Sequence, residues 1–221
     1  MTIPFVDIHT HHDVGSANAI VNLDLLHQIP VEITSKYHSY GIHPWWFDDN
    51  PQPEFFEQQR KLLEQLLREN RLAAIGETGI DKLHEHSLQQ QKESFEQHIL
   101  LSEQYHKPLI IHNVRGTQLL MDLHKKHHPQ QVWIIHGFNG NAEEIKQLTQ
   151  KGWYLSVGES LLYKNRKIHE SIKSIPLEYL FFETDTSNCP IEDIYQKAAE
   201  RLDIHLDQLK AKIFENYSRI L

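Results

Sequence analysis

The sequence predicts an α/β fold of parallel strands, and the arrangement it favours is an eight-stranded (β/α)8 TIM barrel. Short apolar segments alternate with amphipathic segments along the whole chain of 221 residues. Strands that alternate with helices form βαβ units, in which neighbouring strands run parallel. The number of candidate strands is eight, which is the number that closes such a barrel. A doubly wound open sheet has a similar alternation and stays an alternative at this point.

The candidate strands are short apolar runs, four of which end in histidine or glutamate. They are Pro4–His9, Asn18–Leu23, His38–Ile42, Leu72–Gly76, Pro108–His112, Val132–His136, Gly152–Val157 and Glu178–Glu183. Six amphipathic segments are expected to form helices, namely Glu54–Asn70, Ser87–His106, Gly116–His128, Ala142–Lys151, Ile191–Leu202 and Leu206–Leu221. In the first of these, Phe55, Leu62 and Leu66 recur at helical spacing with charged residues opposite.

The connection between the first two candidate strands is unusually short. Only Thr10–Ala17 separates them, whereas a crossover between parallel strands takes roughly a dozen or more residues. We therefore expect an irregular barrel with a shortened first βα unit that lacks its helix.

Composition predicts a single domain over residues 1–221, because no linker, repeat or low-complexity tract divides the chain. The mean hydropathy is −0.53, and no apolar run approaches the roughly 18 residues of a membrane span. The N-terminal segment lacks the apolar core of a secretion signal. The single cysteine, Cys189, fits a reducing compartment. A cytoplasmic protein without membrane contact is expected, with a monomer as the default.

Side chains of the metal-ligand type follow the carboxyl ends of several candidate strands, which is where both α/β architectures place functional residues. They are His9, His11, His43, Glu77, His112, His136 and Asp185. With 17 histidines in the chain, a His-x-His pair is expected by chance about once, so His9 and His11 alone are a weak signal. Side chains alternate across a strand, however, so Asp7, His9 and His11 share one face and the two imidazoles can converge on one ion.

The histidines that end buried strands need partners, because an unpaired buried polar group costs about 1–3 kcal/mol. A shared metal satisfies His112 and His136 together with Glu77 and Asp185. Four imidazoles and two carboxylates suit Zn²⁺, Mn²⁺ or Fe²⁺ better than Mg²⁺. Six ligands exceed the roughly four that one zinc takes, which indicates two ions. Glu77 is the natural bridge, since a carboxylate offers an oxygen to each ion.

Six segments in this order resemble the signature blocks of the TatD-family metal-dependent hydrolases. They are Asp7-x-His9-x-His11, Gly41-Ile42-His43-Pro44, Gly76-Glu77-Thr78-Gly79-Ile80-Asp81, Pro108–His112, His136-Gly137-Phe138-Asn139-Gly140 and Glu183-Thr184-Asp185. Each block is short, but six blocks in register over nearly the whole chain are very specific. The resemblance implies a TIM barrel of the metallo-dependent hydrolase type, two divalent cations (Zn²⁺, Mn²⁺ or Mg²⁺) and phosphodiester hydrolysis, commonly as a DNase of exonuclease type.

The same resemblance implies how the ligands are shared. His9 and His11 with Asp185 would hold the first ion, His112 and His136 the second, and Glu77 would bridge them. Two divalent ions make the site locally cationic in a chain whose formal net charge is −8. The pKa of a metal-bound water falls from 15.7 to about 7 in favourable zinc sites. We expect Asp185 to accept its proton and the resulting hydroxide to attack phosphorus in line.

Four further residues are candidates for secondary roles. Asp7 shares the ligand face and is expected to orient an imidazole. His43 is a candidate to support the site or touch substrate, although a packing role against Pro44 and Trp45 is favoured. The arginine that the family carries just after the His112 block is one place late here, at Arg115. Lys164 follows the seventh candidate strand, where it can reach a backbone phosphate.

Three functions remain open from the sequence. The leading one is a two-metal phosphodiesterase that acts on DNA, single-stranded or at its ends. Because net acidity argues against non-specific duplex binding and one fold hosts many chemistries, a hydrolase of a small amide, lactone or phosphoester is the first alternative. A non-catalytic metal-binding protein is the second, although the candidate ligands lie at strand ends and not in a flexible histidine-rich tract.

Overall fold

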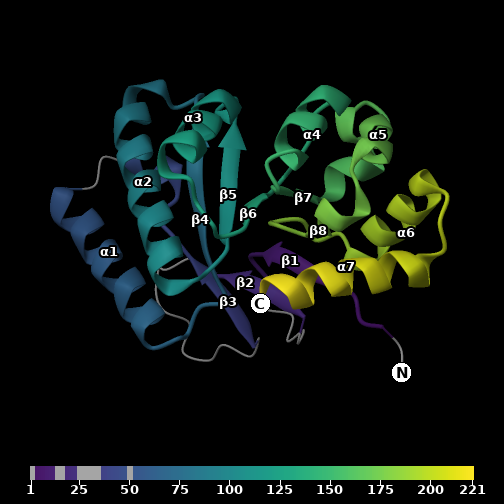
Figure 1. Cartoon of the computed structure of the whole chain (residues 1–221), viewed down its shortest axis with the longest axis horizontal. Helices are drawn as coiled ribbons and strands as arrows, with labels where there is room; N and C mark the ends of the chain where they lie inside the picture. Colours follow the sequence, from purple (N-terminus) through teal and green to yellow (C-terminus); the bar gives the residue numbers. More distant parts are fainter. Residues whose placement is uncertain (1–2, 13–17, 24–35, 49–51) are drawn as a thin grey trace. The chain divides into compact units, whose positions relative to one another are not determined.

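The computed structural model, shown in Figure 1, describes residues 3–12, 18–23, 36–48 and 52–221. Its eight strands follow one another in the sheet in chain order, and the neighbouring strands whose register is defined pair in parallel. A doubly wound sheet does not follow chain order, so this alternative is excluded. The eight strands of the structure correspond to the eight candidate strands. Within the described residues, no helix is long and apolar enough to cross a membrane.

The chain divides into two compact units, Met1–Tyr37 with Ile134–Leu221 and His38–Trp133. The first unit contains β1 (Asp7–Thr10), β2 (Ala19–Asn22), β7 (Tyr154–Val157) and β8 (Leu180–Phe182), with most of β6 (Trp133–Ile135). Its helices are α4 (Ala142–Thr149), α5 (Lys167–Ser171), α6 (Ile191–Leu202) and α7 (Leu206–Ile220). Short 3-10 segments at Glu159–Leu162, Ile172–Ser174 and Leu177–Tyr179 complete it. Helix α5 and these 3-10 segments were not predicted.

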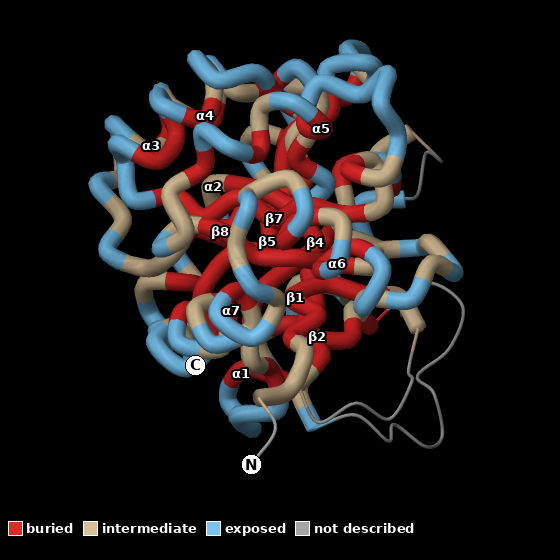
Figure 2. Tube along the Cα trace, turned by 90° about the vertical axis from the view of Figure 1, so that its right-hand side faces the viewer, coloured by how far each residue is buried: buried red, intermediate tan, exposed pale blue. Residues whose placement is uncertain are grey.

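The strands of the first unit are buried, whereas its helices each expose one face to solvent (Figure 2). Tyr195 on α6 ties the helix layer to the chain just before β1, because its hydroxyl donates to the carbonyl of Val6 at 3.0 Å. The Tyr195 ring also packs on Phe182 of β8, with 4.5 Å between ring centroids. Strands β1 and β8 are thereby held against the same helix, and the ends of these strands carry candidate ligands.

The short connection between the first two strands is visible in the strand bounds, since β1 ends at Thr10 and β2 begins at Ala19. The two strands are parallel, with Asp7 opposite Ala19 and Thr10 opposite Val21. The prediction that no helix connects them falls partly outside the described residues, because residues 13–17 are not among them.

The second unit contains β4 (Ala74–Asp81), β5 (Leu109–Val114) and most of β3 (Tyr37–Tyr40), with α1 (Pro53–Arg68), α2 (Leu88–Tyr105) and α3 (Thr117–His127). Two 3-10 segments, Pro44–Phe47 and Glu85–Ser87, follow β3 and β4. Tyr40 of β3 lies opposite Ile75 of β4, and Ile75 lies opposite Leu109 of β5. The predicted helices of this unit all form within a residue or two of their expected ends.

Strand β4 is longer than predicted, because it continues past Gly76 to Asp81. Gly76 and Gly79 are required by the close approach of β5. Gly76 and Gly79 have φ of 143° and 149°, and a Cβ atom at these positions would lie 2.4 Å from the carbonyl oxygen of Ile110 and 2.1 Å from that of His112. Only glycine fits there. The extension places Glu77 and Asp81 on one continuous buried strand.

Candidate metal-binding groups

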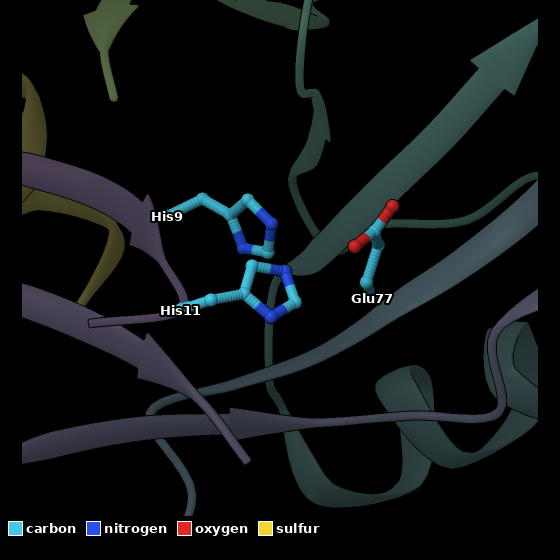
Figure 3. Close-up of side chains that lie close together, drawn as sticks. All are labelled: His9, His11 and Glu77. Carbon is cyan, nitrogen blue, oxygen red and sulfur yellow. The ribbon is translucent and has the colours of Figure 1, made fainter. Parts of the chain in front are cut away.

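In the first unit, His9 and His11 lie at the end of β1 and point to the same side (Figure 3). The Nε2 atoms of both imidazoles lie 3.6 Å from Oδ1 of Asp185. Backbone pairing sets this geometry, since the N–H of His11 donates to the carbonyl of Asp185 at 2.9 Å and the N–H of Asp185 donates to the carbonyl of His9 at 3.0 Å. His9 is fully buried, whereas the Asp185 side chain is 38% exposed.

His136 follows β6 and completes this group. Its ring centroid lies 4.7 Å from that of His9. His9, His136 and Asp185 each offer one ligand atom, and these atoms lie within 4.8 Å of one another. Two imidazole nitrogens and one carboxylate oxygen are a donor set that Zn²⁺, Mn²⁺ and Fe²⁺ accept, so the residues present fit a divalent transition metal.

Asp7 and Glu183 are two buried carboxylates that contact residues of this group or the backbone next to them. The Asp7 carboxylate accepts hydrogen bonds from the N–H of Thr184 at 3.0 Å and from its hydroxyl at 2.6 Å. Burial raises the pKa of Asp7 to about 7, although these bonds oppose the shift. Glu183 is fully buried, accepts the N–H of Gly137 and lies 3.7 Å from Nδ1 of His136. Asp7 therefore anchors the segment that carries Asp185, and the expectation that Asp7 orients an imidazole stays a prediction.

In the second unit, Glu77 extends from β4 (Figure 3). Its side chain is buried, and the imidazoles of His43 and His112 contact its carboxylate. Its Oε1 atom lies 3.0 Å from Nε2 of His43 and 2.7 Å from Nδ1 of His112. His43, Glu77 and His112 form a second group of potential metal ligands within 4.8 Å. His43 also caps the 3-10 segment that follows it, because its Nδ1 accepts the N–H of Trp45. His43 thus contacts the predicted ligand Glu77 in addition to packing beside its own chain neighbours.

Asp81 is a site residue that the sequence analysis did not single out. Its Oδ2 atom lies 3.3 Å from Nε2 of His112 and accepts the indole N–H of Trp45 at 2.8 Å. Burial tends to raise the pKa of Asp81, but the hydrogen bonds from Trp45, Leu83 and His112 outweigh it and lower the pKa below its usual value. A spacing of four residues from Glu77 on one strand puts both carboxylates on the same face, and this signal was available in the sequence.

The six predicted ligands are distributed over both units. His9, His11, His136 and Asp185 gather in the first unit, while Glu77 and His112 meet His43 in the second. The predicted sharing of ligands between two ions and the bridging role of Glu77 stay predictions. Arg115 and Lys164 are both exposed. Arg115 lies directly after β5 and has a left-handed φ of 56°, and Lys164 follows the 3-10 segment Glu159–Leu162. Their proposed contacts with substrate also stay predictions.

His98 on α2 fixes the backbone immediately before His43. Its Nε2 accepts the N–H of Ile42 at 3.0 Å, and its Nδ1 donates to the carbonyl of Ser94 at 2.7 Å. Both roles require a neutral imidazole with its proton on Nδ1. Burial lowers the pKa of His98 from 6.5 to about 4.

This shift predicts a pH-dependent stability. Below about pH 6.5 the unfolded chain protonates His98 while the folded protein does not, so the free energy of unfolding falls as the pH decreases towards about 4, by roughly 3 kcal/mol in all. Urea unfolding at pH 5 and pH 7.5 measures the change, and His98→Gln is expected to reduce it because glutamine keeps an acceptor without titrating. An equal pH dependence in both proteins would contradict the assignment.

Parallel strands that alternate with helices, and that carry imidazole and carboxylate donors at their carboxyl ends, define an α/β protein of the metal-binding barrel class. The chain belongs to the TatD related DNase family, whose sequence model matches residues 20–221. The resemblance of the signature blocks is therefore confirmed.

Relatives of this family are similar to the chain over most of its length. The uncharacterized metal-dependent hydrolase YjjV of Escherichia coli (strain K12) is 27% identical over 157 residues, which are 70% of this chain and 60% of YjjV. The uncharacterized metal-dependent hydrolase YabD of Bacillus subtilis (strain 168) is 34% identical over 157 residues, which are 70% of this chain and 58% of YabD. The matched stretch thus spans less than two thirds of these curated relatives.

Solved structures establish the fold. The crystal structure of YjjV, a TatD homologue from Escherichia coli, matches with a TM-score of 0.84 at 20% identity and covers 100% of this chain and 99% of that one. A TatD-family hydrolase from Entamoeba histolytica matches with a TM-score of 0.79 at 18% identity, covering 100% and 98%. Together with the chain-order sheet of eight strands, these matches confirm the predicted TIM-barrel fold class.

Proposed function

We propose that the chain is a metal-dependent hydrolase that cleaves phosphodiester bonds and acts as a DNase on single-stranded DNA or DNA ends. The observation that carries the proposal is the presence of one group of imidazole and carboxylate donors in each unit. The ligand types suit divalent ions that take nitrogen and oxygen. Membership of the TatD related DNase family supports the same activity.

Different residues of the chain would bind the ions and orient the ligands. His9, His11, His136 and Asp185 of the first unit would hold one ion, and Glu77 with His112 of the second unit the other, which is the stoichiometry of two-metal phosphoryl transfer. This assignment gives His136 to the first ion, whereas the family resemblance implied the second. A bound divalent ion would polarise a phosphoryl oxygen and lower the pKa of its water. His43 orients the Glu77 carboxylate, because its Nδ1 accepts the N–H of Trp45 and its proton is left on Nε2, which faces Oε1 of Glu77.

Asp185 is the carboxylate best placed to accept a proton from the attacking water. Its side chain is 38% exposed, whereas the Glu77 side chain is 6% exposed and already engaged by two imidazoles. A proton acceptor must reach water within hydrogen-bond distance. The greater exposure of Asp185 therefore supports its assignment as the proton acceptor over Glu77.

A pocket beside Asp185 favours a second candidate function, the hydrolysis of a small ester or amide. The pocket has a volume of about 340 Å³, and its lining residues are Gly137, Gly158, Glu159, Ser160, Glu183, Thr184, Asp185, Thr186 and Ser187. This lining combines hydroxyl groups with carboxylates and contains no lysine or arginine. The carboxylates repel a phosphate and no basic side chain of the lining offsets them, so the lining favours a neutral polar substrate.

Metal add-back distinguishes the two candidates. Metal-free protein is incubated with end-labelled single-stranded DNA and with Mg²⁺, Mn²⁺ or Zn²⁺ in separate reactions. Stepwise shortening that requires metal is the expected result. If two ions bind per chain and no DNA is cleaved with any metal, the DNase proposal is wrong, and a panel of small phosphoesters, lactones and amides becomes the test of the second candidate. Absence of any hydrolysis would favour a metal-binding protein.

A further inference from the structure

Trp45 occupies an unusual position beside the second donor group. It lies in the 3-10 segment Pro44–Phe47, directly after His43, and its side chain remains 51% exposed. Its indole N–H nevertheless donates to Oδ2 of Asp81 at 2.8 Å, and Asp81 itself is only 2% exposed. An exposed indole that hydrogen-bonds a buried carboxylate is not explained by core packing.

The neighbouring Trp46 shows the contrast. Trp46 is buried and packs on Tyr40 and Phe55, with ring centroids 6.4 Å and 6.0 Å away. The Trp45 ring instead stands edge-on to His43 and His112, at centroid distances of 4.9 Å and 5.7 Å and interplanar angles of 84° and 77°. Trp46 thus belongs to the core, whereas Trp45 faces the donor group.

The hydrogen bonds connect Trp45 to His112 through Asp81. His112 has Nδ1 2.7 Å from Oε1 of Glu77 and Nε2 3.3 Å from Oδ2 of Asp81. A neutral imidazole carries one proton. His112 can offer the lone pair of Nδ1 to an ion on the Glu77 side only if its proton lies on Nε2, where Asp81 accepts it. When an ion is bound at Nδ1, Asp81 would accept the Nε2 proton and so stabilise the ligating form of His112, and the indole N–H of Trp45 holds the Asp81 oxygen in place.

We propose that Trp45 is a positioning residue that acts through Asp81 to hold His112 in the orientation and tautomer required for metal binding. The inference rests on the proposed metal binding of this group but not on the substrate. Partners of this kind behind a ligating histidine typically change metal affinity by about 10–100-fold. Through this hydrogen bond, the half-exposed indole affects how strongly the second donor group binds metal.

Zn²⁺ affinity, measured without substrate by competition with a chromophoric chelator, tests the proposal. Trp45→Phe keeps an aromatic ring but removes the N–H, and we expect its affinity to fall by about 10-fold. The matched control is Trp46→Phe, which alters a core packing residue and is expected to lower the melting temperature while leaving Zn²⁺ affinity unchanged. Unaltered affinity in Trp45→Phe, or an equal loss in both variants, would overturn the proposal.

A double variant separates action through Asp81 from an independent effect. Asp81→Asn is expected to lose about 10–100-fold in Zn²⁺ affinity, and adding Trp45→Phe to it should change the affinity by less than about twofold, because the pathway is already broken. Losses that multiply would show that Trp45 does not act through Asp81. If Trp45→Phe weakens Zn²⁺ binding and the wild type cleaves no phosphodiester, the inference stands while the DNase proposal fails. A wild type that binds no Zn²⁺ refutes the inference alone, because the Mg²⁺ and Mn²⁺ reactions then decide the DNase proposal.

Discussion

Replacing Asp185 by asparagine is expected to lower kcat on single-stranded DNA by a factor of about 10²–10⁴, which is the usual contribution of a positioned proton acceptor. Asparagine keeps the shape of the side chain but neither ligates a cation as strongly nor accepts a proton. Asp185 has a left-handed φ of 53°, and asparagine is one of the few residues that tolerate this conformation. The fold should therefore persist, as far-UV circular dichroism and thermal unfolding would show.

Asp203→Asn is the matched control for this variant. Asp203 has a φ of 55° and ends α6 at an exposed position. The control thus repeats the same chemical change at the same backbone conformation away from the donor groups, and full turnover is expected. Wild-type kcat in Asp185→Asn would show that another group accepts the proton. If the protein only buffers metal, Asp185→Asn would reduce the number of bound ions without any turnover to lose.

Replacing Glu77 by glutamine is expected to remove the ion of the second donor group and with it DNA cleavage. Oε1 of Glu77 lies within 3.0 Å of nitrogens from both His43 and His112, so loss of its charge affects the whole group. The effect on metal affinity should exceed the roughly 10–100-fold seen when residues behind the ligands are changed. Elemental analysis of bound metal after dialysis, together with the cleavage assay, measures both losses.

Glu96→Gln provides the comparison within the same unit. Glu96 on α2 forms an ion pair with Lys126 at 2.9 Å, and exposed pairs of this kind contribute at most about 1 kcal/mol. Its variant should retain full metal content and full turnover. A Glu77→Gln protein with the metal content and cleavage rate of this control would exclude Glu77 as a ligand.

The ends of strands show where sequence patterns succeed. The runs that end at His9 and His112 combine β-branched apolar residues with a terminal polar group, and both form buried strands in β1 and β5. The apolar composition of these runs and the alternating direction of their side chains are local properties, so they can be predicted from neighbouring residues. The predicted end of β4 at Gly76 was wrong, because Gly76 and Gly79 are needed for close contact with β5, a strand more than 30 residues later that local sequence does not reveal.

The sequence by itself determined the order of strands and helices and the residue types that follow the strand ends, since hydrophobic periodicity and ligand chemistry reside in short segments. The tertiary structure decided which side chains meet. Asp7 bonds Thr184, 177 residues away, and Trp45 reaches Asp81, 36 residues away. Such contacts depend on strand register and on rotamers chosen by packing. Hydrogen bonds that select a tautomer or lower a pKa therefore become visible only when the chain is folded.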